Sequence, residues 1–426
     1  MRDVGIVMPV YKQDPVYLEL ALRSILEQSY QSYYFVIVSD GAPSEINDII
    51  KKIIKGDQRV QFIVKEKNEG VAKALNTGFD FLMNIEEVKY LTWVSSDNIY
   101  FSNFVEVLRA ALVQGTAELG LVYSSFRHID HNGNHILNED LVAFRKFQEK
   151  PKEKLLDYCY VGTSFMYKKQ YAAMISGYWM EPVEDYEYWL RLTEHCEIQY
   201  IPVELMDYRV SSPHSISAQL QGSIVQHRRW RYTFNLAKQQ ARNRRGIPFE
   251  TTVIFPVQQF SDKVVTQYEQ ILEQSYSNYK LLILDLSPNS DVSNGLKHIS
   301  DPRVAFFELS NVSLEKALMF GIEAADTPFT LLYGLGYFPK ALDSFSILID
   351  MHDKLSKKPE YVHVVSTFFW NRLTHPRQKL FPTNAGPVSF NTFSAQLKPQ
   401  FCELYRTKML EEIIVKKNKG GLEKNE

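Results

Sequence analysis

Short apolar runs alternate with amphipathic stretches along the first hundred residues of the chain. The strand-like runs are residues 4–10, 34–38, 60–64 and 90–94. After the first run, Asp14 and Pro15 form a helix cap and a first turn, and apolar residues at helical spacing follow: Leu18, Ala21, Leu22 and Ile25. Residues 71–82 have the same periodicity. Strands that alternate with helices predict an α/β fold with a mostly parallel, Rossmann-like sheet covered by helices on both faces.

Two acidic residues stand directly after predicted strands. Asp40 follows the second run and Asp97 follows the fourth. Because ligands of open α/β sheets bind at the carboxyl ends of strands, we expect both carboxylates near one binding site. The segment 95–98 (SSDN) also favours turns, so its local sequence leaves a purely structural turn open.

The chain contains an internal repeat. The hexapeptide ILEQSY occurs at residues 25–30 and again at 271–276, an offset of 271 − 25 = 246. Five further segments match in the same order: 8–10 with 255–257, 34–38 with 280–284, 57–60 with 301–304, 68–78 with 311–321 and 90–94 with 329–333. Colinear matches of this kind predict a duplicated α/β unit.

The two copies differ in their acidic residues. Asp40 aligns with Leu286, and Asp97 aligns with Gly336. A hydrophobic pattern that is kept without its carboxylates predicts a second copy without catalytic activity. We therefore expect a catalytic domain at 1–220, a basic helical linker at 221–247, a degenerate repeat of the same fold at 248–415 and a charged tail at 416–426.

Composition narrows the classes of function. A chain of 426 residues is long enough for at least two domains, and 45% apolar residues are enough to fill their cores. The formal net charge of −2 gives no electrostatic reason to expect a nucleic-acid partner. Cys159, Cys196 and Cys402 stand far apart without metal-ligand spacing, which fits a reducing compartment.

The predicted location is the cytoplasm. The N-terminus runs into a strand without a signal-peptide pattern, and no apolar stretch has the length of a membrane span. Residues 227–245 are basic and predicted to be helical, and such a helix can lie on the inner face of an anionic membrane. The alternative that we favour is a linker helix that packs Trp230 and Phe234 against a domain.

Ordered motifs in the first half resemble the family-2 glycosyltransferases, which have the GT-A fold. The resemblance covers roughly residues 3–217 and rests on the segments 7–11, 24–30, 39–42, 68–78, 95–97, 184–192 and 208–217. It implies an inverting transfer of a sugar from a nucleotide-diphosphate sugar, with a UDP-sugar favoured, to a hydroxyl of a carbohydrate or lipid-linked acceptor. The chain departs from the family at Ser39 and Ser95, where family members carry an acid, and at Leu75, where they often carry an Arg.

The resemblance also implies a role for individual residues. The nucleotide-sugar-binding residues are Pro9, Val10, Tyr11, Asp40, Gly70, Lys73, Ser95, Ser96 and Asp97. Asp97 is the expected ligand of Mn²⁺ or Mg²⁺, because a divalent cation offsets the charge of the departing diphosphate. Gly162 and Thr163 are expected to line the acceptor side. Lys73 also fits a solvated helix residue, and His214 in the closing segment fits either a metal or diphosphate contact or a structural residue.

Asp185 is the expected general base, with Glu184 as a supporting contact. The acceptor hydroxyl must lose a proton on the face opposite the leaving group, and a single base there implies direct displacement with inversion. The same two acids also fit plain helix caps, because residues 188–192 continue as a helix and acids complement a helix N-terminus. That position would lower the pKa of a carboxyl group and weaken it as a base.

Two other classes of function stay open. A nucleotide-sugar-binding scaffold without turnover fits the reduced set of acids, although the presence of both Asp97 and Asp185 argues against it. A nucleotidyltransferase is disfavoured, because residues 9–12 (PVYK) offer no glycine cradle for a triphosphate. Three roles fit the second copy: orienting the acceptor, supporting a homodimer or binding another partner.

Overall fold

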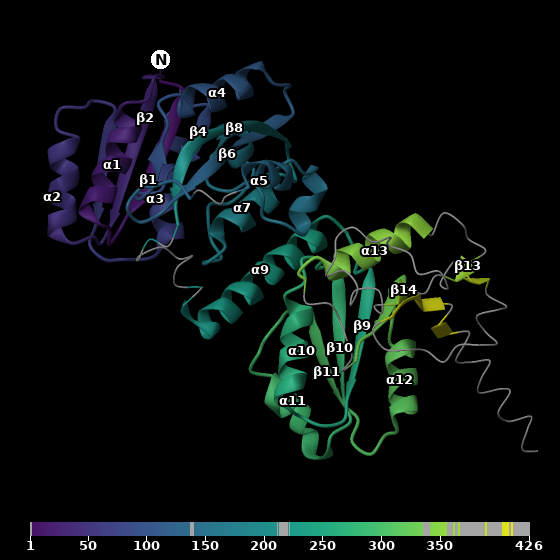
Figure 1. Ribbon diagram of the computed structural model, residues 1–426. Helices are drawn as coiled ribbons and strands as arrows, with labels where there is room; N and C mark the ends of the chain where they lie inside the picture. Colours follow the sequence, from purple (N-terminus) through teal and green to yellow (C-terminus); the bar gives the residue numbers. More distant parts are fainter. Residues whose placement is uncertain are drawn as a thin grey trace, which may run out of the picture. The chain divides into compact units, whose positions relative to one another are not determined.

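The computed structural model describes residues 2–136, 140–210, 212, 220, 222–334, 341–355, 361–362, 365–366, 388–389, 403–408 and 410–411. The chain divides into two compact units, Met1–Ala241 and Arg242–Glu426 (Figure 1). Several sequence-based predictions fall on residues outside those ranges: His214, residues 215–217, Gly336, Cys402 and the tail 416–426.

Unit 1 is built on a mixed sheet whose first part is parallel. Its strands are β1 (Val4–Val10), β2 (Tyr33–Asp40), β3 (Val60–Lys65), β4 (Tyr90–Trp93), β5 (Ile99–Tyr100), β6 (Leu119–Ile129), β7 (Phe165–Lys168) and β8 (Glu197–Arg209). Their order in the sheet is β3-β2-β1-β4-β7-β6-β8-β5. Strands β3, β2, β1 and β4 run parallel, whereas β7 is antiparallel to β4 and to β6. The α/β fold with a mostly parallel sheet is therefore confirmed for this unit.

Two helices of unit 1, α1 and α3, begin where the sequence predicts them. The unit contains α1 (Pro15–Leu26), α2 (Ser44–Ile53), α3 (Val71–Met83), α4 (Phe104–Gln114), α5 (Leu141–Gln148), α6 (Lys169–Ala172) and α7 (Glu184–Leu192), with a 3₁₀ turn at Lys152–Leu156. Asp14 caps α1 by accepting a hydrogen bond from the backbone N–H of Val16 at 2.8 Å, and Pro15 stands in its first turn. The predicted apolar face of α1 is buried as expected.

Helices cover both faces of the sheet. On one face, alternate residues of β1 join a core with α1, α2 and α4. On the other face, Gly78 of α3 packs so closely on Val7 that a Cβ atom there would lie 2.5 Å from the valine side chain. Helices α3 and α7 share this second face, because the ring of Tyr167 on β7 contacts both Phe79 of α3 and Trp189 of α7. The helix after the predicted donor loop and the helix with the predicted base are thus neighbours.

Unit 2 has a mixed sheet with the same order in its first four strands. The main sheet contains β9 (Thr251–Val257), β10 (Tyr279–Asp285), β11 (Val304–Glu308), β12 (Phe329–Leu332), β14 (Val365–Ser366) and β16 (Glu403–Arg406), and β13 (Tyr361–Val362) pairs with β15 (Val388–Ser389). The order β11-β10-β9-β12 is parallel and corresponds to β3-β2-β1-β4, and an antiparallel strand follows in both sheets. The helices are α10 (Asp262–Leu272), α11 (Asp291–Leu296), α12 (Leu314–Glu323) and α13 (Ser344–Leu355), with a 3₁₀ turn at Pro288–Ser290.

Side-chain contacts also correspond between the units. Tyr33 and Tyr279 each donate a hydrogen bond to the carbonyl oxygen eight residues earlier, at 2.8 and 2.7 Å. The guanidinium groups of Arg59 and Arg303 lie over these two rings, 4.7 and 4.3 Å from the ring centres. The same contacts between Tyr and Arg thus recur within or directly beside the segments that the repeat aligns.

The basic stretch 227–245 lies largely within α9 (Ile224–Arg244). Phe234 stacks on Tyr186 of α7 with ring centres 4.3 Å apart, and Trp230 stacks on Phe234 at 4.9 Å. Arg231 and Lys238 are each 2% exposed, so part of the basic charge faces inward. These contacts support the packed linker helix, and the membrane contact stays a prediction.

The described part of the chain contains no helix that is long and apolar enough to span a bilayer.

Candidate functional site

The carboxyl ends of β1, β2 and β4 bring several predicted donor residues to one edge of the sheet. Val10 pairs with Ser39, which places the end of β1 beside Asp40. Val7 pairs with Trp93, so the turn that contains Asp97 leaves the sheet on the other side of β1. Pro9 is half-buried, Val10 is buried and Tyr11 is exposed at this edge. The structure therefore brings these residues together as the strand pattern predicts.

The carboxylate of Asp40 is held by the protein itself. Lys65 Nζ lies 2.6 Å from Oδ1, and the backbone N–H groups of Glu69 and Gly70 donate to Oδ2 at 3.1 and 2.9 Å. Asp40 is 3% exposed. Its observed role is to fix the loop before α3, and a direct contact with a nucleoside stays a prediction.

The loop before α3 requires glycine at residue 70. Gly70 has a φ of +99°, and a Cβ atom on it would lie 2.5 Å from Oε1 of Glu181. Glu181 in turn accepts a hydrogen bond from the backbone N–H of Ala72 at 2.8 Å. Lys73 follows with its side chain 67% exposed and its Nζ 3.7 Å from Glu69, so it extends from the first turn of α3 into solvent.

The turn with Asp97 has one carboxylate where an acidic pair is expected. Ser95 Oγ donates to Asp97 Oδ1 at 2.8 Å, and Gln13 donates to Ser96 Oγ at 3.1 Å. The buried Arg209 holds the back of the turn, because its Nε donates to the Asp97 carbonyl oxygen at 3.1 Å. Asp97 Oδ2 accepts no hydrogen bond from the residues that the structure describes.

This donor set limits how a divalent cation could bind. The described residues contain no cluster of three or more His, Cys, Asp or Glu side chains that could hold a metal ion. Asp97 can offer one carboxylate oxygen, with the Ser95 hydroxyl beside it. Mg²⁺ and Mn²⁺ often take one or two carboxylates and complete their shell with phosphate oxygens and water. The residues therefore fit a cation that arrives with a diphosphate, and they do not form an all-protein metal site.

The predicted catalytic acids open α7 and are buried. Glu184 is 6% exposed, and its Oε2 is buried without a hydrogen-bond partner among the described residues. Burial, followed by the charges of Asp185 and Glu181, raises the pKa of Glu184 to about 8. Burial also raises the pKa of Asp185, although its Oδ1 accepts a hydrogen bond from the Tyr186 N–H at 2.6 Å. The expectation that the helix N-terminus lowers the pKa of these carboxyl groups is wrong, because loss of hydration outweighs the backbone dipoles.

The predicted acceptor residues Gly162 and Thr163 lie just before β7 in the chain. Gly162 has a φ of +71°, and a Cβ atom on it would lie 2.8 Å from the ring of Phe126. Thr163 Oγ1 lies 3.6 Å from Met206 Sδ. Burial raises the pKa of Cys159, and the charge of Asp185 adds to the rise, which puts this thiol within electrostatic range of the predicted base. Contact of Gly162 and Thr163 with an acceptor stays a prediction.

Comparison with known proteins identifies this domain. Residues 5–174 match the family model described as "Glycosyl transferase family 2". These residues form a glycosyltransferase family 2 domain. An uncharacterized glycosyltransferase of Rickettsia bellii is 22% identical over 439 residues, which cover 92% of this chain and 60% of that protein. The chain thus spans about 60% of the length of this relative.

Two solved structures are similar to the chain with TM-scores of 0.44 and 0.42. S. aureus TarS 1-349 in complex with UDP-GlcNAc has a TM-score of 0.44 and 11% identity, over 76% of this chain and 81% of that one. The mannosyltransferase PcManGT from Pyrobaculum calidifontis, in complex with GDP-Man and Mn²⁺, has a TM-score of 0.42 and 13% identity, over 57% and 63%. Both scores are low, so the family match alone identifies the glycosyltransferase domain.

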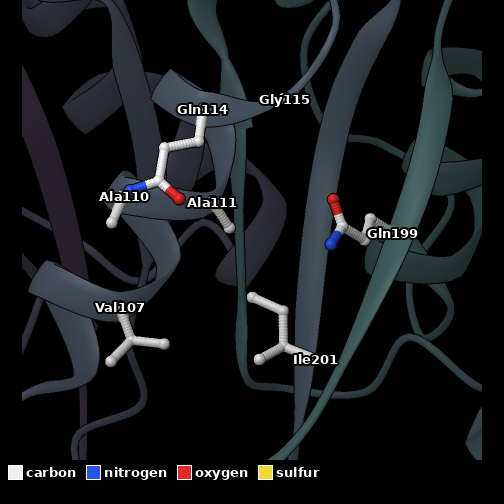
Figure 2. A pocket seen from close by; sticks show the side chains of 7 residues that line it. All are labelled: Val107, Ala110, Ala111, Gln114, Gly115, Gln199 and Ile201. Carbon is white, nitrogen blue, oxygen red and sulfur yellow. The ribbon is translucent and has the colours of Figure 1, made fainter.

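Unit 1 also has a shallow pocket away from these residues. It has a volume of about 390 Å³ and lies between α4 and β8. Figure 2 shows the side chains that line it: Val107, Ala110, Ala111, Gln114, Gly115, Gln199 and Ile201. None of these side chains titrates near neutral pH or is a nucleophile, so the pocket offers no catalytic group.

Sequence reasoning missed three residues of the site. Lys65 ends β3 beside Asp40, and the rule that parallel strands end at one edge of the sheet could have found it. Glu181 stands three residues before Glu184, but its partner Ala72 lies 109 residues earlier. Arg209 belongs to a segment that the sequence singled out, but its partner Asp97 is 112 residues away. Contacts over such separations have no local sequence signal.

The buried acid Glu184 gives a first testable expectation: the variant Glu184→Gln should flatten the pH dependence of stability between about pH 4.5 and 8. The pKa of Glu184 is raised in the folded state, so the folded chain keeps a proton that the unfolded chain releases. The contribution of this proton to the free energy of unfolding is fully present below the pKa of Glu184 in the unfolded chain, and it is lost as the pH rises toward 8. One proton corresponds to up to about 1.4 kcal/mol per pH unit in the free energy of unfolding.

Urea unfolding at several pH values in this range measures the effect. The exposed Glu45 provides the matched control, because Glu45→Gln removes a carboxylate without changing a buried charge. The same pH dependence in Glu184→Gln and wild type would contradict a raised pKa.

Proposed function

We propose that the chain is an inverting glycosyltransferase that moves a sugar from a nucleotide-diphosphate sugar, with a UDP-sugar favoured, to a hydroxyl of a carbohydrate or lipid-linked acceptor. The observation that carries this proposal is the family-2 match over residues 5–174, together with Asp97 at the sheet edge that the match covers. The buried acids at the start of α7 support it, because a base with a raised pKa accepts a proton well near neutral pH.

Each residue has a defined task in this proposal. The edge formed by Tyr11, Asp40 and the loop at Gly70 holds the nucleoside, with Lys65 and Asp40 keeping the loop in place. Asp97 offers Oδ2 to Mn²⁺ or Mg²⁺, and that cation, when bound, stabilises charge on the leaving diphosphate. Asp185 removes the proton from the acceptor hydroxyl, which then attacks the anomeric carbon from the side opposite the diphosphate.

Within the same proposal, residues 248–415 form a degenerate repeat without catalytic activity. Leu286 takes the place of Asp40, and the adjacent Asp285 is completely buried. Its oxygens accept hydrogen bonds from the N–H groups of Ser287 and Ser293 at 2.9 and 2.7 Å, so this carboxylate orders its own loop. The equal strand orders and the matched Tyr and Arg contacts support the duplication. Orienting the acceptor, supporting a homodimer and binding a partner remain the proposed roles.

A panel of UDP-, GDP- and dTDP-sugars tests the proposed activity. Incubation with the full chain should release nucleoside diphosphate slowly from one donor in the presence of Mn²⁺, and EDTA should abolish the release. The panel also identifies the base and the sugar.

The rival class is a nucleotide-sugar-binding scaffold, favoured by the serine at residue 95 and by the internal contacts of Asp40. Tight binding of a donor, with neither hydrolysis nor transfer to any of a set of acceptor sugars, would favour the scaffold. The cytoplasmic location and the peripheral membrane contact through 227–245 remain predictions.

A further inference from the structure

Residues 176–182, here called the strap, lead into α7 and are tied to α3. Asn76 of α3 makes two hydrogen bonds with the backbone of Tyr178: its Nδ2 donates to the carbonyl oxygen at 2.8 Å, and its Oδ1 accepts from the N–H at 2.7 Å. A Cβ atom on Gly177 would lie 2.3 Å from Asn76 Oδ1, so this approach needs glycine. The middle of the strap is thus fixed to the helix that follows the donor loop.

The strap is tied to α7 as well. Arg191 Nε forms a buried ion pair with Glu187 Oε1 at 2.7 Å, and Arg191 Nη2 donates to the carbonyl oxygen of Gly177 at 2.8 Å. The ring of Tyr178 stacks on Tyr188 with centres 4.0 Å apart and planes 6° from parallel. Both helices therefore hold the same segment.

Glu181 of the strap contacts the donor loop and the first turn of α3. Its carboxylate accepts the hydrogen bond from Ala72 N–H in the first turn of α3, where a negative charge also complements the helix dipole. It fills the space that the missing side chain of Gly70 leaves open. Met180 before it has a φ of +64°, a costly conformation for a non-glycine residue that persists only where surrounding contacts hold it.

The charge of Glu181 also acts on the start of α7. The negative charges that disfavour ionisation of Glu184 come from Asp185 on α7 itself and from Glu181 on the strap. Removing the charge of Glu181 therefore makes Glu184 easier to ionise, independently of the hydrogen bond to Ala72.

We propose that Glu181 is a positioning residue that fixes the donor loop and the first turn of α3 relative to Glu184 and Asp185. The proposal rests on the proposed function and extends it: Glu181 contacts neither donor nor acceptor, and it acts through the loop at Gly70 and through the charge at Glu184. Its two effects can be separated, because a glutamine keeps an acceptor for Ala72 N–H and loses only the charge.

The test compares Glu181→Ala with Glu181→Gln. Loss of a charged hydrogen bond should raise the donor KM of Glu181→Ala about tenfold or more. Glu181→Gln should keep a donor KM close to wild type, but the pH range over which Glu184 changes the free energy of unfolding should move to lower pH. Equal KM increases in both variants, with an unchanged pH dependence of stability in Glu181→Gln, would overturn the proposal.

Hydrogen exchange gives a readout that does not depend on turnover. In Glu181→Ala, amides of residues 70–75 and of residues 183–188 should both exchange faster than in wild type, whereas Glu181→Gln should leave them protected. Asn76→Ala is the matched control, because it loosens the strap without changing a charge and should leave the pH dependence of stability in place. If no donor is hydrolysed by wild type, the proposed function fails, and unchanged exchange in Glu181→Ala would separately overturn the role of Glu181.

Discussion

Replacing Asp185 by Asn should lower the rate of sugar transfer by about a thousandfold, because general-base catalysis typically contributes two to four orders of magnitude. Asp185 is buried at the start of α7, and burial raises its pKa toward the range where a carboxylate takes up a proton from an attacking hydroxyl. Asparagine has almost the same shape and cannot accept that proton. The nucleotide itself lies on the side of the donor loop in our proposal, so its affinity should change little.

The measurement is kcat with a saturating donor, beside the dissociation constant of the nucleoside diphosphate. Glu184→Gln is the matched comparison, because it changes the adjacent buried acid and should reduce kcat far less. The opposite ranking, with Glu184→Gln inactive and Asp185→Asn active, would transfer the role of base to Glu184. A full loss of nucleotide binding in Asp185→Asn would show instead that the variant disturbs the donor site.

Elements with local signals were predictable from the sequence. The cap at Asp14 and the buried face of α1 were both correct, since each depends on residues within one or two turns. The placement of Asp40 and Asp97 at one sheet edge followed from the rule on parallel strands, without knowledge of any contact. The family resemblance also came from ordered local motifs, and the family match over residues 5–174 supports it.

The state of the carboxylates could not be predicted in the same way. The sequence placed Asp185 at a helix N-terminus and predicted a lowered pKa, but it carries no information on the burial that raises it. Asp40 has the expected position, yet its oxygens are used by Lys65 and by the backbone of the loop before α3. Both outcomes depend on packing between segments that are distant in the chain, which hydrophobic periodicity does not encode.

Replacing Asp97 by Ala should remove the metal dependence of donor hydrolysis and lower its rate by about a thousandfold, since several kcal/mol of leaving-group stabilisation correspond to such a factor. Asp97 is the carboxylate of its turn, and Ser95 already donates to one of its oxygens at 2.8 Å. Because a single remaining oxygen holds a cation weakly, wild type should bind Mn²⁺ tightly only together with a nucleoside diphosphate. Calorimetric titration of Mn²⁺, with and without UDP, measures this directly.

The serine at residue 95 makes the metal prediction specific to this chain. Ser95→Asp would put a second carboxylate beside Asp97. Because a bound cation relieves the repulsion between the two carboxylates, this variant should bind Mn²⁺ without nucleotide, whereas wild type without nucleotide binds it weakly. The exposed Asp48, whose side chain is 73% accessible, gives the control, because Asp48→Ala removes an acid far from any expected ligand and should leave both titrations unchanged. If wild type binds Mn²⁺ as tightly without UDP as with UDP, the dependence on nucleotide is contradicted. Unaltered metal-dependent hydrolysis in Asp97→Ala would remove Asp97 from the metal site altogether, and Asp97 Oδ2 would then have no role in the leaving-group chemistry.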